Sequence, residues 1–339
     1  MLNIKENISL KPFNTFGIEA YGTYFVEINS IDDFLLLLKT DIYINNLKLI
    51  IGGGSNILFT KDFNGLVIKN NLKGIELINE TTDEVIIKAA AGENWHEFVQ
   101  WSIKNNFCGL ENLSLIPGCV GASPMQNIGA YGVEIKDVFY ELEAIHTITG
   151  EKKTFKKDDC AFGYRESVFK TKYKNQFLIT SVSFKLSKHQ NLNTSYGAIN
   201  TELEAMGINK PTVKDVSKAV INIRQSKLPD PKITGNAGSF FKNAEVSKEK
   251  YESLKSQFEE IVSYSLPNGN FKLAAGWLIE QCGLKGFEKN GAAVHAKQAL
   301  VLINKNNCTG TAVFELSDYV LQKVFDKFGV ILEREVNII

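Results

Sequence analysis

The stretch IPGCVGASPMQNIGAYG, from Ile116 to Gly132, is the part of the sequence that most restricts the fold. It holds four glycines and two prolines. Ordering so flexible a segment costs conformational entropy, and a bound ligand would compensate for it. Small side chains let the backbone approach a ligand, and successive N–H groups form a concavity that suits a phosphate or diphosphate. A tight turn without a ligand is the alternative that the residues alone leave open.

A second loop of the same character, GGGSN at Gly52–Asn56, follows the apolar run LKLII. This pattern is typical of a buried strand that leads into a flexible loop. One bound dinucleotide would explain both loops. The loop lacks the Rossmann fingerprint, because Ile57 and Phe59 occupy the candidate places of the remaining glycine. No Walker lysine follows it either, so ATP hydrolysis has no support.

The segments around these two loops predict alternating strands and helices in the first half of the chain. YFVEINSIDDFLLLLK predicts a strand and then a helix, with Ser30 and Asp33 forming a capping box. VIIKAAAGENWHEFVQWSIKNNFCG predicts a strand, a turn at Gly92 and an amphipathic helix. Residues 138–188 predict further strands, including a hairpin in LEAIHTITGEKKTF.

Helices return in the last third of the chain. They are expected from Thr212, in KLAAGWLIEQCGLKG up to Gly283, and in a final segment that ends at Gly329 before a strand, VILEREVNII. The pattern predicts an α+β protein: two α/β subdomains in the N-terminal half and a smaller C-terminal α/β domain that starts near residue 200.

Composition narrows the class of protein. A chain of 339 residues is long enough for about two domains. Because 38 acidic side chains balance 38 basic ones, the net charge of zero argues against a nucleic-acid binder. Five cysteines without a Cys-x-x-Cys pair indicate neither a disulfide framework nor a zinc site, so we expect a reducing, cytoplasmic location and no metal. Apolar runs such as FLLLL are too short to span a membrane.

Nine motifs, in order over nearly the whole chain, resemble those of the UDP-N-acetylenolpyruvoylglucosamine reductase (MurB) family of peptidoglycan synthesis. They are NTFG at Asn14, GGGSN at Gly52, AGENWHEFV at Ala91, GLENLSLIPGCVGASPMQNIGAYGVE at Gly109, FGYRES at Phe162, RQSKLPDP at Arg224, GNAGSFFKN at Gly235, KLAAGWLIEQCGLKG at Lys272 and AAVHAKQALVLIN at Ala292. SYGAIN, around Tyr196, resembles the extra loop of the subclass in which a tyrosine closes over the substrate.

The resemblance implies a fold and a cofactor. Residues 1–190 would form an FAD-binding domain of the vanillyl-alcohol-oxidase (p-cresol methylhydroxylase) type, made of two α/β subdomains. Residues 200–339 would form a substrate-binding domain whose last strand returns Glu335 to the active site. FAD would bind noncovalently, with His96 and His295 structural. The expected FAD contacts are Gly52, Gly53, Gly54, Ser55, Asn56, Gly92, Pro117, Gly118, Ala122, Ser123, Asn127, Gly129, Ala130 and Tyr131.

The family reaction implies roles for three further residues. NADPH would reduce FAD, and flavin N5 would pass a hydride to C3 of UDP-N-acetylglucosamine enolpyruvate, giving UDP-N-acetylmuramate. Ser239 would protonate C2, since a carbanion is a strong enough base to take a proton from an alcohol. Arg165 would bind the substrate carboxylate as charge grows on it, and a protonated Glu335 would assist. The phenylalanines after Ser239 would exclude water.

Each of these residues also has a less specific interpretation. Arg165 alone could be a surface arginine, Ser239 a turn or capping residue, and Glu333 or Glu335 an exposed carboxylate at a strand end. The chain also departs from the family pattern, because Asn337 stands where an arginine usually follows Glu335.

By resemblance, the UDP-sugar would be held by a set of cationic and polar side chains, and the protein would be a monomer. The set is Tyr164, Tyr196, Arg224, Lys227, Asn243, Lys272 and Gln298. Two other functions remain open: a flavin oxidase on the same fold, which would not need GNAGSFFKN, and a non-catalytic UDP-sugar binding module, which would purify colourless.

Overall fold

The computed structural model describes residues 2–339 and divides the chain into two compact units. The first contains the residues up to Ile8, Gly22–Gly53 and Asn64–Ser226. The second contains Ser9–Tyr21, Gly54–Phe63 and Lys227–Ile339. The first unit therefore extends beyond residue 200, where the sequence suggests a boundary, because the two helices between residues 197 and 227 belong with it.

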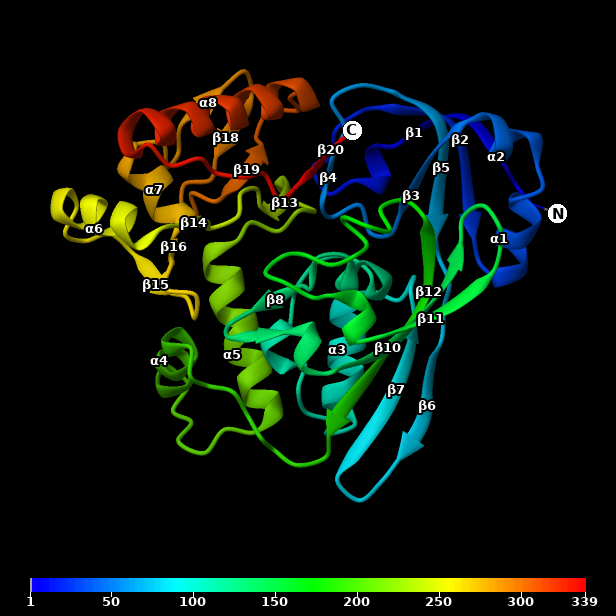
Figure 1. The fold of residues 1–339 in the computed structure, drawn as a ribbon, viewed down its shortest axis with the longest axis horizontal. Helices are drawn as coiled ribbons and strands as arrows, with labels where there is room; N and C mark the ends of the chain where they lie inside the picture. The colour runs from blue at the N-terminus through cyan, green and yellow to red at the C-terminus, as the bar shows by residue number, and fades with distance from the viewer. Residues whose placement is uncertain (1) are drawn as a thin grey trace. The chain divides into compact units, whose positions relative to one another are not determined.

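A four-stranded sheet in the order β1-β2-β5-β3 forms one part of the first unit (Figure 1). Its strands are β1 (Lys5–Ser9), β2 (Tyr21–Ile28), β3 (Leu47–Ile51) and β5 (Phe63–Asn70), with helices α1 (Ile31–Leu37) and α2 (Asp41–Asn45) between β2 and β3. The predicted capping box of α1 is confirmed: the Ser30 hydroxyl accepts a hydrogen bond from Asp33 N–H, and Asp33 accepts one from Ser30 N–H.

LKLII forms the predicted strand, but the expectation that this strand is buried is wrong, because only Ile51 is buried. β3 lies at the edge of its sheet and pairs only with β5, in parallel, so one side has no neighbouring strand. Leu47 is 70% exposed. The apolar run carried no information about which strand would end at the edge.

The second part of the first unit is an antiparallel sheet in the order β11-β10-β12-β7-β6. Its strands are β6 (Ile75–Glu80), β7 (Glu84–Ala90), β10 (Phe139–His146), β11 (Lys152–Lys156) and β12 (Phe177–Ser187). The predicted hairpin is β10–β11. Helix α3 (Trp95–Lys104) packs on the sheet through Phe98, whose ring centroid lies 5.2 Å from that of Phe184.

Short elements fill the connections of the first unit. They are the strands β8 (Gly129–Ala130) and β9 (Val133–Glu134) and the 3₁₀ helices η2 (Glu111–Leu113), η3 (Val120–Gln126), η4 (Ile135–Asp137) and η5 (Asp158–Cys160). The glycine-rich stretch 116–132 is thus ordered, mostly as η3 and as one strand of the β8–β9 hairpin.

Helices α4 (Gly197–Ala205) and α5 (Val213–Lys227) share a small apolar core built around Ile199 and Val220. Thr212 and Asp215 cap α5 reciprocally, as the sequence predicts. The Ser217 hydroxyl joins α5 to the core of the first unit by hydrogen bonds with Ser114, at 2.8 Å, and Gln100, at 3.1 Å.

The second unit contains a sheet in the order β13-β19-β18-β17 and a smaller sheet in the order β14-β16-β15. Its strands are β4 (Ile57–Leu58), β13 (Gly235–Ser239), β14 (Ala244–Val246), β15 (Ser263–Ser265), β16 (Phe271–Leu273), β17 (Glu288–Lys289), β18 (Ala292–Val294), β19 (Val301–Asn304) and β20 (Asn337–Ile338). Its helices are η1 (Lys11–Phe13), α6 (Lys248–Gln257), α7 (Ala275–Gln281) and α8 (Gly310–Phe328).

The end of the chain differs from the prediction. α8 ends at Gly329, with φ of 59°, as expected, but the strand predicted for VILEREVNII is reduced to β20. β20 pairs in parallel with β4, and an isolated bridge joins Arg334 to Phe241. The segment is extended, but it meets two different partners, so no continuous ladder forms. Within residues 2–339, no helix is both long enough and apolar enough to cross a membrane.

Candidate active site

The two glycine-rich loops meet in the first unit, after the last residue of β3 and near the first residue of α3. A Cβ atom on Gly53 would lie 2.9 Å from Gly118 Cα, and one on Gly52 would lie 3.3 Å from Cys119 Cβ. Contacts this close leave no room for a side chain at Gly53. The structure therefore brings together two of the segments that the sequence predicts to hold one dinucleotide.

The turn at Gly92 belongs to the same cluster. A Cβ on Gly92 would lie 2.6 Å from the Asn71 carbonyl carbon, so this position also requires glycine. Val120 N–H donates to Glu93 O at 2.9 Å, and Trp95 N–H donates to Gly118 O at 3.0 Å. These bonds fix the second loop against the start of α3.

Two lysines that the sequence analysis missed support these loops. Lys69 Nζ donates to Gly52 O, and Lys73 Nζ donates to Gly92 O at 2.6 Å. Lys73 also pairs with Glu93 at 3.6 Å. The two ammonium groups place positive charge beside the glycine turns, as a diphosphate site requires. Isolated lysines form no motif, so only the fold could identify them.

Side chains of the long loop that were expected to bind FAD are used inside the protein. Asn127 is fully buried, with φ of 45°, and its Nδ2 donates to Gly163 O and to Glu134 Oε2, both at 3.0 Å. The Ser123 hydroxyl donates to Val120 O at 2.7 Å. These two residues therefore shape the loop, and a contact with FAD would have to come from its backbone.

Arg165 occupies a tight turn between Gly163 and Glu166, whose backbones exchange two hydrogen bonds. Its φ of 54° lies in the left-handed region, which is unfavourable for a residue with a side chain. One guanidinium nitrogen donates to Gly129 O at 2.7 Å. Tyr164, beside it in the turn, places its ring centroid 5.6 Å from Arg165 Cζ.

Arg224 lies in the first unit beside the glycine-rich stretch. Its Nε donates to Leu115 O at 3.3 Å, and a hydrogen bond joins its guanidinium to the Tyr131 hydroxyl. Burial lowers the pKa of Arg224 and raises that of Tyr131. The expected contact of Arg224 with the UDP-sugar stays a prediction.

His96 supports the same stretch from α3. Its Nδ1 accepts a hydrogen bond from Leu115 N–H at 2.9 Å, so the neutral ring carries its proton on Nε2. Burial and the charge of Arg224 lower the pKa of His96, while Glu97 opposes them. Leu115 has φ of 59°, and its peptide is held on both sides, by His96 and by Arg224.

In the second unit, Ser239 lies at an irregularity of β13. The pairing of β13 with β19 shifts between Asn236 and Ser239, and Gly238 takes φ of 69°. Asn236, which the sequence analysis missed, is 3% exposed; its Oδ1 accepts from Gly238 N–H at 2.9 Å, and its Nδ2 donates to Thr234 O at 2.8 Å. This bulge leaves Ser239 exposed.

The expectation that the two phenylalanines after Ser239 exclude water from the reaction stays a prediction. Phe240 and Phe241 are 0% and 1% exposed. Their ring centroids lie 5.2 Å apart, and the ring centroid of Phe240 lies 6.2 Å from that of Phe16. They anchor the strand in the core of the second unit, with Ser239 at its surface.

The C-terminal segment bonds Glu335 to Phe240, the residue that follows Ser239. Glu335 N–H donates to Phe240 O at 2.8 Å, and Asn56 Nδ2 donates to Glu335 O at 3.2 Å. Asn337, which replaces the expected arginine, donates from Nδ2 to Asn56 O at 3.0 Å. Glu333 points to the surface, 71% exposed in its side chain, and pairs with Lys242 at 3.1 Å.

Two of the predicted UDP-sugar residues meet at the start of α7. Asn243 Oδ1 accepts from Ala275 N–H at 3.0 Å, and a Cβ on Gly276 would lie 3.3 Å from Gln298 Oε1. Lys272 lies on β16, three residues before α7. Lys227, the last residue of α5, is exposed, while Tyr196 lies in the first unit with its ring 5.3 Å from that of Tyr131.

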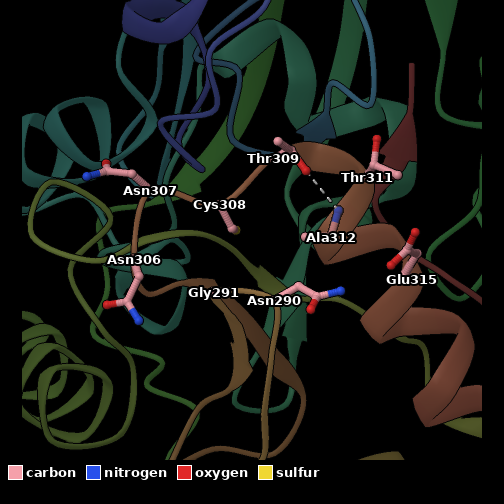
Figure 2. A pocket seen from close by; sticks show the side chains of 9 residues that line it. All are labelled: Asn290, Gly291, Asn306, Asn307, Cys308, Thr309, Thr311, Ala312 and Glu315. Carbon is pink, nitrogen blue, oxygen red and sulfur yellow. Dashed lines mark hydrogen bonds between the residues drawn. The ribbon is translucent and has the colours of Figure 1, made fainter.

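A separate polar pocket opens at the start of α8 (Figure 2). Thr309 caps this helix by accepting a hydrogen bond from Ala312 N–H at 3.2 Å. Gly291 O accepts from the N–H groups of Lys305 and Asn306, which closes the neighbouring loop. None of the predicted site residues lines this pocket. Within residues 2–339, no group of three or more His, Cys, Asp or Glu residues could hold a metal ion.

The fold and the paired glycine loops define an FAD-binding oxidoreductase. A family model described as an FAD binding domain matches residues 26–154, and the model of the UDP-N-acetylenolpyruvoylglucosamine reductase C-terminal domain matches residues 230–339. A curated UDP-N-acetylenolpyruvoylglucosamine reductase from Flavobacterium johnsoniae is 52% identical over 339 residues, covering 100% of both chains. The chain belongs to the UDP-N-acetylenolpyruvoylglucosamine reductase family.

Solved structures agree with this fold. The crystal structure of UDP-N-acetylenolpyruvylglucosamine reductase (MurB) from Thermus caldophilus superimposes with a TM-score of 0.68 at 19% identity, covering 100% of this chain and 99% of the other. Substrate-bound p-cresol methylhydroxylase gives 0.50 at 11% identity, covering 96% and 83%. The expected fold of the FAD-binding domain is confirmed.

The residues present fit FAD. Gly53 and Gly118 form a backbone approach that a Cβ would block, and Lys69 and Lys73 supply positive charge beside it. This donor set suits the diphosphate of a dinucleotide, which needs backbone groups at close range and cations nearby.

Proposed function

We propose that this chain reduces UDP-N-acetylglucosamine enolpyruvate to UDP-N-acetylmuramate, with NADPH as the electron source and noncovalent FAD as the cofactor. Full-length identity of 52% to a curated reductase supports the substrate. The structural observation that carries the proposal is the position of Glu335, whose N–H donates to the carbonyl oxygen of Phe240, the residue that follows the exposed Ser239.

When bound, FAD supplies the two-electron transfer that connects NADPH with the C2–C3 double bond of the enolpyruvyl group. In the overall reaction, two electrons and a proton reach C3, a second proton reaches C2, and NADPH becomes NADP⁺. Negative charge develops at C2 and on the adjacent carboxylate before C2 is protonated. The side chains of the protein must stabilise this charge and supply the second proton.

Ser239 is our proposed donor of the proton to C2. The bulge at Gly238 exposes its hydroxyl, and the buried Phe240 and Phe241 fix the strand that carries it. A hydroxyl is a weak acid, but it can protonate a carbon that carries developing negative charge.

Arg165 and Glu335 are our proposed carboxylate-binding residues. The bond from Arg165 to Gly129 O orients the plane of the guanidinium, which suits bidentate binding of a carboxylate. Glu335, when protonated, would donate a hydrogen bond to the substrate carboxylate. The UDP moiety would be bound by the seven cationic and polar side chains named from the sequence, of which Asn243 and Gln298 already meet at α7.

We further propose a monomeric protein in the cytoplasm. None of the five cysteines is in a disulfide, which fits a reducing compartment. Sedimentation of the purified protein tests the oligomeric state.

The test is a spectroscopic assay of the purified protein. We expect a yellow preparation with a flavin absorption band, and oxidation of NADPH that depends on the UDP-sugar. In D₂O, one deuterium should appear at C2 of the product. Rapid oxidation of NADPH in air without the UDP-sugar would instead indicate a flavin oxidase, and a colourless protein that binds the UDP-sugar would indicate a binding module.

A further inference from the structure

The hairpin β8–β9 in the first unit has a strained turn. Ala130 pairs with Val133, so Tyr131 and Gly132 form a two-residue loop, with φ of 51° and 80°. Such loops favour asparagine or glycine at the first position, because both residues need positive φ. A tyrosine there strains the backbone, because its Cβ is crowded at positive φ. Contacts from outside the hairpin must therefore hold this turn.

Asn112, in η2, makes one of these contacts. It is 1% exposed, and its Nδ2 donates to two backbone carbonyls, Tyr131 O at 2.9 Å and Asn193 O at 2.8 Å. Two converging carbonyls require the NH₂ group at this place, so the orientation of the amide is fixed. Its Oδ1 is buried without a hydrogen-bond partner, which is unfavourable. The side chain of Asn112 therefore stabilises the turn through the two carbonyl groups that it joins.

The second carbonyl belongs to the segment that carries Tyr196. We call residues 189–196, between β12 and α4, the tyrosine loop. Asn193 also donates from its Nδ2 to Gly132 O at 3.2 Å, and the Tyr196 ring packs edge-on against Tyr131 at 5.3 Å. The other end of the loop is held separately, by a hydrogen bond between His189 Nε2 and Asp83 Oδ1 at 2.7 Å.

We propose that Asn112 is a positioning residue that ties the tyrosine loop to the turn at Tyr131–Gly132, so that the two segments order and loosen together. One buried NH₂ group bonds both segments, so its loss removes a hydrogen bond from each of them at once. Its effect on the reaction rests on the proposed function, in which Tyr131 lies at the cofactor and Tyr196 at the UDP-sugar. Substrate that orders Tyr196 would then bind more weakly when Asn112 is absent.

Hydrogen–deuterium exchange on the FAD-bound protein tests the coupling without an activity assay. In Asn112→Ala we expect amides in both 128–132 and 189–196 to exchange about tenfold faster or more, since two hydrogen bonds of about 1 kcal/mol each are lost. Asp83→Ala is the matched control, because it removes the hydrogen bond to His189 at the far end of the tyrosine loop and should leave 128–132 unchanged. Faster exchange in one segment alone in Asn112→Ala would overturn the proposal.

Kinetics give a second, separate readout. We expect Asn112→Ala to raise KM for the UDP-sugar about tenfold and to change kcat less than about threefold, because the lost bonds act on the binding loop. A tenfold fall in kcat with an unchanged KM would count against the proposal. If the wild-type protein does not reduce the UDP-sugar, the proposed function fails while the exchange experiment still decides the coupling. Should Asn112→Ala not fold, Asn112→Ser, with a shorter hydroxyl donor, must show the same paired change in exchange.

Discussion

The turn around Arg165 and the bulge around Ser239 place two proposed functional side chains in different ways. Arg165 itself takes the left-handed conformation, with φ of 54°. At the bulge, the neighbouring Gly238 takes it, with φ of 69°, and Ser239 keeps an ordinary backbone. The first arrangement strains the functional residue, and the second moves the strain to a glycine that tolerates it.

The groups that hold Arg165 and Ser239 in place also differ. Arg165 is held by its own side chain, through the bond to Gly129 O. Ser239 is held by its neighbours, since Asn236 accepts from Gly238 N–H and Phe240 lies in the core. Substitution of Ser239 should therefore change the chemistry alone, while substitution of Arg165 should change stability as well.

The largest expected effect is that of Ser239→Ala on the second half of the reaction. The exposed hydroxyl supports no element of the fold, so the free energy of unfolding should stay unchanged. NADPH should still bleach the flavin at nearly the wild-type rate. Reoxidation by the UDP-sugar should slow about 10²–10⁴-fold, the usual contribution of a positioned general acid. Stopped-flow absorbance measures each half-reaction separately.

Ser239→Cys is the control, because a thiol keeps a proton to donate and should lose less than the alanine variant. Our assignment of Ser239 as the proton donor fails if Ser239→Ala slows flavin reduction as much as reoxidation, or slows neither.

Gly238→Ala tests the bulge beside Ser239 directly, because it puts a side chain on the residue with positive φ. No atom lies within 4 Å of a Cβ at Gly238, so the loss comes from the positive φ alone, about 1–2 kcal/mol in the free energy of unfolding. Reoxidation by the UDP-sugar should also slow, since Ser239 would move with the bulge. Gly207→Ala is the matched control, with φ of 73° and equally open space. It should lose similar stability in urea unfolding and keep its activity; equal activity in both variants would contradict the prediction.

Arg165→Gly and Arg165→Ala together measure the backbone strain at Arg165. Both variants lose the bond to Gly129 O, so the difference between them isolates the backbone. The glycine variant should be more stable than the alanine variant by about 1 kcal/mol, because only glycine relaxes at φ of 54°. Urea unfolding of the two proteins measures this difference, and equal stability would show that the turn is not strained.

The smallest expected effect concerns Leu115, another strained non-glycine residue, which is held by His96. The pKa of His96 is lower in the folded protein than its ordinary value of 6.5, so the unfolded chain takes up the proton first as the pH falls. The stability that His96 contributes is complete above about pH 6.5 and declines below it, by at most about 1.4 kcal/mol per pH unit.

His96→Gln should flatten this decline between about pH 7 and pH 5, as measured by urea unfolding at each pH. His146→Gln serves as the control for a general histidine effect. An unchanged pH profile in His96→Gln would refute the assignment of the decline to the His96–Leu115 bond.

Local signals predicted the elements that the structure confirms. Ser30 with Asp33 and Thr212 with Asp215 place helix starts, and Gly329 places a helix end, because a cap involves residues only a few positions apart. The two failures are of another kind. Whether β3 lies at an edge, and whether residues 330–339 form one strand, depends on partners far away in the sequence.

The candidate site shows the same division. Asn112 and Asn236 stand inside motifs read from the sequence, and Asn236 is a polar residue among small ones, which is the signal that could have identified it. Asn236 bonds to residues two positions away, but the partner of Asn112 could not be predicted, because Asn112 meets Asn193 over 81 positions. The packing of Phe240 and Phe241 could not be predicted either, because only the structure shows that both side chains are buried in the core.

The sequence by itself determined the two glycine-rich loops, the order of the family motifs and most helix ends, because each of these depends on the backbone preferences of neighbouring residues. Only the tertiary structure decided that Gly53 touches Gly118, that Lys69 holds Gly52, and that Glu335 bonds to Phe240, the residue that follows Ser239. Those contacts depend on sheet order and on the path of the chain ends. Strand pairing sets both, and strand pairing joins residues that the local sequence cannot relate.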